Sequence, residues 1–97
     1  MEVLEVAAFR LASGVSDESF KNADTAMQRW SYVHVPGLRR RTTARNAEGT
    51  WCVLTVYSPA PALVSLEELT TQSGAPGEFA KLIDASSFRL ARFETLD

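Results

Sequence analysis

Residues 50–57, with the sequence TWCVLTVY, decide the fold of this 97-residue chain. The run is rich in β-branched and aromatic residues and lies between turn-forming segments, Asn46–Gly49 before it and Ser58–Pro61 after it, which is typical of a β-strand. Alternation gives it two faces, one with Trp51, Val53, Thr55 and Tyr57 and the other with Cys52, Leu54 and Val56. Because both faces are largely apolar, the pattern predicts a central strand that is covered on both sides.

The segments before this strand predict a second apolar strand, a long helix and a polar edge strand. Residues 3–12 are also apolar on both faces. Ser16 is the predicted N-cap of an amphipathic helix whose inner stripe ends near Pro36-Gly37. Residues 38–45 are polar and basic, as expected of an edge strand whose arginines stay in water.

The segments after it predict further helix and one more strand. A second helix is predicted to open at Ser58–Pro61, with proline near its first turn, and to be broken at Gly74–Gly77. A short helical stretch over 78–83 and a last strand over 88–96 follow. The order β-α-β-β-α-β predicts an α+β, ferredoxin-like domain spanning 1–97.

In this fold a four-stranded antiparallel sheet carries its helices on one face, with the strands ordered last, first, third, second. The sequence does not say which face meets the helices. It does predict that the other face needs cover, since Leu4, Val6 and Ala8 extend the apolar set of Cys52, Leu54 and Val56. A second copy of the sheet would supply that cover and make a homodimer.

Composition excludes several classes of function. A net charge of −2 and a pI near 5.4 argue against a nucleic-acid partner. One cysteine and one histidine exclude an internal disulfide and a zinc site built from several such ligands. There is no apolar run near 18 residues, and acidic residues stand where a signal peptide would be basic, so we expect a cytoplasmic protein with no membrane partner.

The chain resembles the dimeric α/β barrel proteins of the antibiotic biosynthesis monooxygenase-like superfamily, in particular its small uncharacterised members. The matching segments are EVAAFRL at 5–11 with GVS at 14–16, PG at 36–37 followed by LRRR at 38–41, EGTW at 48–51, and FAKLID at 79–84 with Ser87 and Phe93-Glu94. The resemblance implies a homodimer whose two sheets form a barrel, with a pocket between sheet and helices in each subunit. It also implies a choice of activities: some members oxidise aromatic polyketides or quinols with O₂ and neither metal nor flavin, and some degrade haem.

Two departures from the family bear on this choice. The resemblance implies an asparagine on the first strand of the haem-degrading members. The first strand of this chain carries none, which counts against haem degradation. For the small members the resemblance implies a polar residue at the position of Val53 and often a histidine at that of Val56, so these valines count against carrying over a polar site on the third strand.

The residues and the resemblance together give a first functional hypothesis, a cofactor-independent monooxygenase acting on a phenolic, quinol or polyketide-like molecule, with no metal. Such chemistry needs a proton acceptor and a dry pocket that shields a substrate anion. Tyr57 and His34 are the candidate catalytic residues, and Phe9, Trp30, Trp51 and Arg40 are the candidate ligand contacts.

Each candidate also has a structural explanation. The aromatic residues can be core, and an imidazole in the last helical turn favours the helix dipole. The alternative function is therefore a dimeric protein that binds a small apolar or aromatic molecule without catalysis, which the apolar Val53 and Val56 favour.

Overall fold

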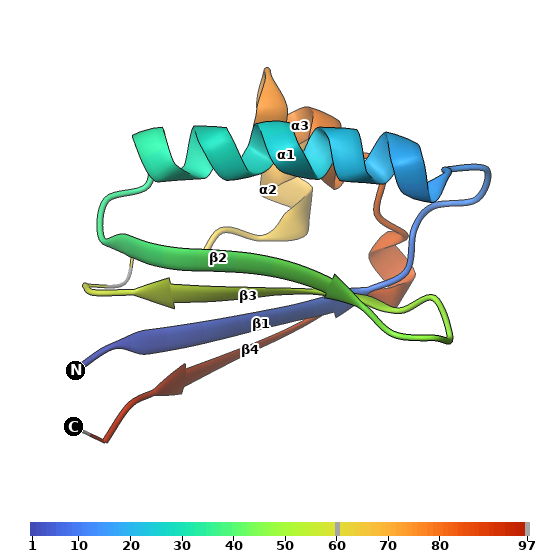
Figure 1. The fold of residues 1–97 in the computed structure, drawn as a ribbon. Coiled ribbons are helices and arrows are strands. Elements are labelled where there is room, and N and C mark those ends of the chain that lie inside the picture. The colour runs from blue at the N-terminus through green and yellow to red at the C-terminus, as the bar shows by residue number, and fades with distance from the viewer. Residues whose placement is uncertain (60, 97) are drawn as a thin grey trace.

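The computed structural model describes residues 1–59 and 61–96. It has two layers, a four-stranded sheet and a set of helices on one of its faces (Figure 1). The elements in chain order are β1 (Val3–Phe9), α1 (Asp17–His34), β2 (Leu38–Arg45), β3 (Trp51–Tyr57), α2 (Leu66–Thr70), α3 (Ala75–Ala80), a 3-10 turn η1 (Ala85–Ser87) and β4 (Arg89–Glu94). With α2 and α3 in the place of one second helix, this order confirms the predicted α+β, ferredoxin-like class.

The sheet has the predicted strand order, β2-β3-β1-β4, with the two apolar strands β1 and β3 at its centre. All three pairings are antiparallel. Val6 of β1 faces Leu54 of β3 on one side and Ala91 of β4 on the other. This register fixes which side chains share a face, because side chains alternate along each strand.

The face that meets the helices, open from the sequence, is the one that carries Phe9, Trp51 and Val53. All three are buried, with at most 7% of the residue exposed. The alternate positions, with Leu4, Val6, Leu54 and Val56 on the central strands, point away from the helix layer. We call this second surface the open face.

An aromatic cluster fills the core at one end of the helix layer. Phe20 of α1 is fully buried and lies with its ring centroid 4.7 Å from Trp51, 5.3 Å from Phe79 and 5.7 Å from Phe9. Such offset and tilted pairs add to the stabilisation from buried apolar area. The cluster joins α1, α3 and the two central strands.

Helix α1 begins and ends where the sequence predicts. The hydroxyl of Ser16 accepts a hydrogen bond from the backbone N–H of Ser19 at 3.1 Å, which caps the helix. Gly37 then turns the chain into β2 with φ +81°, and its carbonyl accepts from the N–H of Ser58 at 2.8 Å. A Cβ at Gly37 would lie 2.2 Å from the carbonyl oxygen of Pro59, so this turn requires glycine.

The prediction for the second helical segment is wrong at its start. Residues 61–65 carry no helix, and α2 starts only after Ser65, whose side chain forms a capping box with Glu68. Ala60, part of the predicted start, lies outside the described residues. The break between the two helical stretches lies at residues 71–74 and not at 74–77, and α3 covers Ala75–Ala80 instead of the predicted 78–83. Gly74 is the N-cap of α3, and Pro76 lies in its first turn, where a missing N–H costs no hydrogen bond.

Three strands are shorter than predicted, and β3 begins at Trp51 rather than at Thr50. β1 ends at Phe9 rather than Ala12, and Leu11 makes only an isolated bridge with Ile83. β4 runs over Arg89–Glu94 instead of 88–96. Within residues 1–59 and 61–96, no helix combines the length and apolar character needed to cross a membrane.

Candidate functional site

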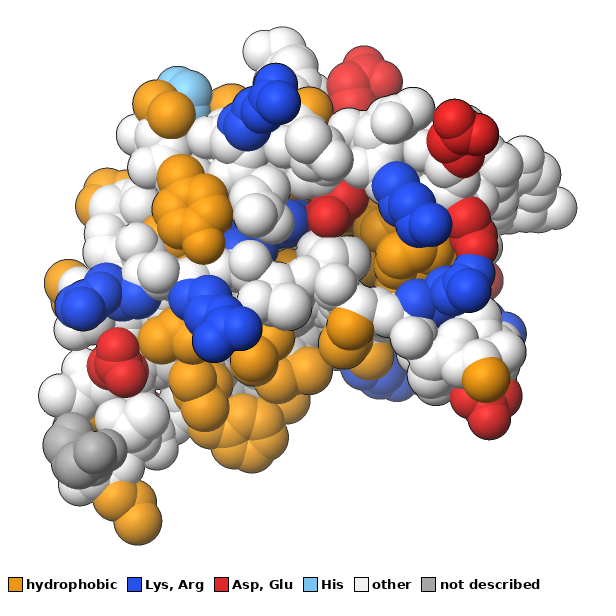
Figure 2. Space-filling model, in the orientation of Figure 1, with side chains coloured by type: hydrophobic (Ala, Val, Ile, Leu, Met, Phe, Trp, Pro, Cys, Tyr) orange, Lys and Arg blue, Asp and Glu red, His pale blue; other side chains and the backbone are white. Residues whose placement is uncertain are grey.

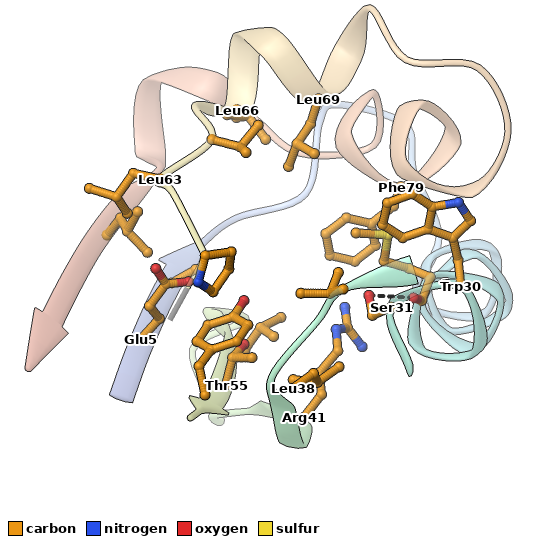
Figure 3. A pocket seen from close by; sticks show the side chains of 18 of the residues that line it. Glu5, Trp30, Ser31, Leu38, Arg41, Thr55, Leu63, Leu66, Leu69 and Phe79 are labelled. Atoms are coloured by element: carbon orange, nitrogen blue, oxygen red, sulfur yellow. Dashed lines mark hydrogen bonds between the residues drawn. The ribbon is translucent and has the colours of Figure 1, made fainter. Parts of the chain in front are cut away.

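A cavity of about 310 Å³ lies between the sheet and the helix layer. Its walls come from β1, β2, β3 and β4, from the second half of α1, and from residues 61–72 and 79–90 (Figure 3). Most of the lining is apolar, and its polar side chains are Glu5, Ser31, His34, Arg41, Thr55, Tyr57 and Gln72. The volume is at the lower end of the range for small-molecule sites.

The cavity floor contains a row of polar residues that crosses the whole sheet. Arg92 of β4 pairs with Glu5 of β1, Glu5 with Thr55 of β3, and Thr55 with Arg41 of β2. Of these four, Glu5, Thr55 and Arg41 line the cavity, and Figure 3 shows Glu5 and Arg41 on either side of Thr55. At about 4.8 Å between neighbouring strands, the backbones of Glu5 and Arg41 are roughly 10 Å apart.

Glu5 is held by an ion pair with Arg92. The guanidinium donates from Nε to Glu5 Oε2 at 2.8 Å and also from Nη2, and it donates to the carbonyl oxygen of Pro61 at 3.1 Å. The same arginine therefore fixes the carboxylate on the floor and the segment that leads from β3 to α2.

Tyr57 stands next to Glu5 at this end of the cavity. Burial is the largest influence on its phenol and, with the adjacent Glu5 carboxylate, raises the pKa of Tyr57 to about 12. The phenol therefore keeps its proton throughout the physiological pH range. It can donate a hydrogen bond to a ligand oxygen, but it is a poor base.

Arg41 is the buried cation of the site, with 4% of its side chain exposed. Its Nη2 lies 2.8 Å from Asp24 Oδ1 on α1, and its Nη1 makes long contacts of 3.4 Å with Gln28 and Thr43. The guanidinium also lies over the Phe79 ring, 5.3 Å from the centroid. The prediction that the arginines of this strand stay in water is wrong for Arg41, because α1 covers β2 and supplies a carboxylate.

His34 and Trp30 line the cavity from the last two turns of α1. Their rings stack with centroids 4.8 Å apart, and His34 Nδ1 lies 3.0 Å from the carbonyl oxygen of Trp30. When Nδ1 carries the proton and donates it to this carbonyl, Nε2 keeps a free lone pair. His34 is itself exposed, so the imidazole belongs to the rim and not to the interior.

The structure brings four of the six sequence-predicted site residues together around the cavity: Tyr57, His34, Phe9 and Trp30. Trp51 lies outside the lining, in the aromatic core against Phe20, with Arg45 over its ring. Arg40 lies on the other side of β2 from Arg41 and donates to Thr42 at 3.2 Å. The roles assigned to these six residues stay predictions.

Sequence reasoning missed Glu5, Thr55 and Arg41. The available signal for Glu5 was a charged residue within a strand that is otherwise apolar, VLEVAAF. For Arg41 the signal was Asp24 on the helix that precedes it, but only the register reveals that the two meet. Within the described residues no group of three or more His, Cys, Asp or Glu side chains is placed to hold a metal ion.

Comparisons with known proteins give a likeness of structure and none of sequence. No protein-family model matches the chain, and no curated protein matches its sequence. A Caulobacter crescentus structure described as a "putative antibiotic biosynthesis monooxygenase" superposes with a TM-score of 0.67 at 15% identity, covering 99% of this chain and 91% of that one. Rv0793 from Mycobacterium tuberculosis gives 0.65 at 15% identity, covering 100% and 97%.

A third structure, from Bacteroides fragilis, is described as a dimeric protein of unknown function with a ferredoxin-like fold. It gives a TM-score of 0.59 at 14% identity and covers 97% of this chain and 96% of that one. At these identities the likeness concerns the fold. The fold implied by the sequence resemblance is thus confirmed: this chain has the ferredoxin-like architecture of structures that include one described as a "putative antibiotic biosynthesis monooxygenase".

Proposed function

We propose that this protein is a cofactor-independent monooxygenase that oxidises a small phenolic, quinol or polyketide-like molecule in the cavity. For an anthrone-like substrate the balance is R₂CH₂ + O₂ → R₂C=O + H₂O: one oxygen atom enters the product and the other leaves as water. The substrate carbon loses two protons and is oxidised, and O₂ is reduced. The description of the Caulobacter crescentus structure as a "putative antibiotic biosynthesis monooxygenase" supports this class of reaction.

The observation that carries the proposal is the composition of the cavity. Its lining is mostly apolar, yet a phenol and a carboxylate, Tyr57 and Glu5, stand together on its floor. Cofactor-free oxygenation needs little more from a protein than this: a proton acceptor, a hydrogen-bond donor for the substrate oxygen, and the exclusion of water from the substrate anion.

The groups take distinct roles in the proposal. Tyr57, neutral because of its raised pKa, donates a hydrogen bond to a substrate hydroxyl at the Glu5 end of the cavity. The proton that leaves the substrate goes to Glu5 on the floor or to His34 Nε2 at the rim. Trp30 and Phe9 provide the apolar walls.

Oxygen uptake by the purified protein against anthrones, quinols and catechols tests the proposal. We expect turnover above the uncatalysed rate with one class, and a loss of about 10²–10⁴-fold when the true proton acceptor is removed, so Glu5→Gln and His34→Ala tell the two apart. Tyr57→Phe should also lower kcat. Tyr32→Phe is the matched control, because that phenol is not part of the cavity lining and accepts from the Arg41 backbone N–H.

Unchanged uptake in Tyr57→Phe, Glu5→Gln and His34→Ala together would remove the catalytic assignment. The second candidate function would then be favoured, a protein that binds a small aromatic molecule without reacting with it. Val53 supports that candidate, since it lines the cavity where the family resemblance implies a polar residue. Val56 does not bear on the cavity, because it lies on the open face.

We further propose a homodimer in which a second copy covers the open face. Apolar side chains gather on the side of the molecule away from the helices (Figure 2). This face carries Leu4, Val6, Ala8, Cys52, Leu54, Val56, Ala91 and Phe93, of which Phe93 is 56% exposed. An apolar surface of this kind is expected to be covered by a partner, and the Bacteroides fragilis structure is described as dimeric.

Sedimentation equilibrium at micromolar concentration tests the dimer. We expect twice the chain mass of 10.7 kDa, and a shift toward that mass itself in Leu54→Arg, which places a charge at the centre of the open face. Glu18→Arg, on the exposed first turn of α1, is the control for added charge. A wild-type mass near 10.7 kDa would refute the proposal.

A further inference from the structure

The cavity floor presents two opposite charges, and their counter-ions lie outside the cavity. Glu5 and Arg41 are part of the lining, whereas their partners Arg92 and Asp24 are not. We propose that Arg41 is an anion-binding group, and that the ligand of this cavity is an aromatic molecule bound with an ionised oxygen, a phenolate or enolate, against the Arg41 guanidinium. This inference rests on the proposed function for its aromatic ligand class.

The contacts of Arg41 leave it able to bind a ligand. Its interactions with Asp24, Gln28 and Thr43 use the two terminal nitrogens, and none among residues 1–59 and 61–96 uses Nε. The two 3.4 Å contacts of Nη1 are at the long end for hydrogen bonds and cost little to exchange for a shorter bond to an anion. Asp24 and the Phe79 ring hold the guanidinium in place, and Arg41 remains part of the cavity lining.

Burial makes this charge effective. An exposed arginine is screened by water and salt, but 4% exposure leaves Arg41 in surroundings of low polarity, where charge interactions are stronger. Arg39, Arg40 and Arg45 are not part of the cavity lining and are exposed. Arg41 is therefore the arginine of β2 that a bound anion would meet.

The second charge sets the orientation. Glu5 repels an anion, so the ionised oxygen takes the Arg41 side of the floor, and a ligand hydroxyl or the carbon that loses its proton takes the Glu5–Tyr57 side, two strands away in the sheet. The two charges on the floor thus set the orientation in which a ligand binds in the otherwise apolar cavity.

Binding of 4-nitrophenol tests the anion site without any turnover, because its phenol and phenolate forms absorb at different wavelengths. We expect the ionisation midpoint of the bound probe to lie roughly one pH unit or more below that of the free probe, since an opposite charge within about 6 Å has an effect of this size. One unit means that the phenolate binds about tenfold more tightly than the phenol. 4-Nitroanisole, which cannot ionise, should bind equally to wild type and variants.

Three variants locate the effect. Arg41→Gln should return the midpoint of the bound probe to the free value, and Arg41→Lys should keep part of the shift. The double variant Asp24→Asn/Arg41→Gln should give the same midpoint as Arg41→Gln alone. Because it leaves no buried carboxylate without a partner, it replaces the single variant if Arg41→Gln fails to fold. Arg45→Gln is the matched control on the same strand and sheet face, paired with Asp17 outside the cavity, and should keep the full shift.

The proposal is overturned if the wild-type protein does not lower the midpoint, if the shift survives Arg41→Gln, if Arg45→Gln removes it equally, or if the probe does not bind at millimolar concentration. The oxygenase proposal fails separately. A lowered midpoint without oxygen uptake for any substrate would support the anion site and refute the oxygenase proposal. Oxygen uptake without a lowered midpoint would support the oxygenase proposal and refute the anion site.

Discussion

Three ion pairs on the helix-facing side of the sheet should contribute to stability in the order of their burial. Arg41–Asp24 has side-chain exposures of 4% and 15%, Arg92–Glu5 has 28% and 14%, and Arg45–Asp17 has 47% and 46%. The first and the third pair both connect β2 to α1, so they join the same two elements and differ mainly in how far they are buried. The perturbation is to neutralise each carboxylate in turn, with Asp24→Asn, Glu5→Gln and Asp17→Asn.

The expected losses of unfolding free energy follow from what each variant leaves behind. Asp24→Asn leaves a buried guanidinium without its counter-ion, which costs about 3–5 kcal/mol for a buried pair. Asp17→Asn breaks a solvated pair, worth about 0.2–1 kcal/mol. Glu5→Gln should fall between them at about 2 kcal/mol, because Arg92 keeps water and the Pro61 carbonyl as partners.

Urea unfolding followed by tryptophan fluorescence measures these losses, provided that the transition is two-state and its slope is unchanged. Adding the matching arginine variants completes three double-mutant cycles, which isolate the coupling within each pair. Equal coupling in the Arg41–Asp24 and Arg45–Asp17 cycles would refute the argument that burial gives Arg41 its strong field.

Three further predictions concern the core, one turn and the buried phenol. Phe20→Ala should cost about 3–5 kcal/mol of unfolding free energy, because the ring is fully buried; a loss below about 1 kcal/mol would contradict its place in the core. Gly37→Ala should destabilise the protein clearly more than Gly14→Ala. Both glycines have φ above +80°, but of the two only Gly37 would place the new Cβ against another group, the Pro59 carbonyl. Equal losses of stability in thermal unfolding would exclude that contact. Burial raises the pKa of Tyr57 to about 12, while an unfolded tyrosine ionises near pH 10, so the stability present below pH 10 should be lost as the pH rises toward 12. Tyr57→Phe should reduce this dependence of the unfolding free energy on pH, measured by unfolding at several pH values. An equally steep dependence in both proteins would contradict the raised pKa.

Local sequence patterns predict most of this fold. Alternating apolar residues place β1 and β3 at the centre of the sheet, and the Ser16 cap with the stripe of α1 places the long helix. The error at α2 has a physical reason. Prolines favour a first helical turn, but they equally favour extended backbone, and here the Pro61 carbonyl is bound by Arg92 from the far edge of the sheet.

The candidate site is less predictable, because it depends on pairing between distant segments. Tyr57 and His34 stand out by residue type, whereas Glu5 gains its meaning from Arg92 and Arg41 from Asp24. Alternation separates Arg40 from Arg41 along the strand. It cannot tell which of the two faces a helix, and this decides which one is buried.

The Glu5–Arg92 pair also has a consequence for the order in which the protein is built. These partners are 87 residues apart, so during synthesis the Glu5 carboxylate stays without its counter-ion until the chain has grown by those 87 residues. Contacts of such separation form late and slow folding, because a long loop must close first. Pairing of β4 with β1, which brings Arg92 to Glu5, is therefore expected to be among the last contacts to form when the protein folds.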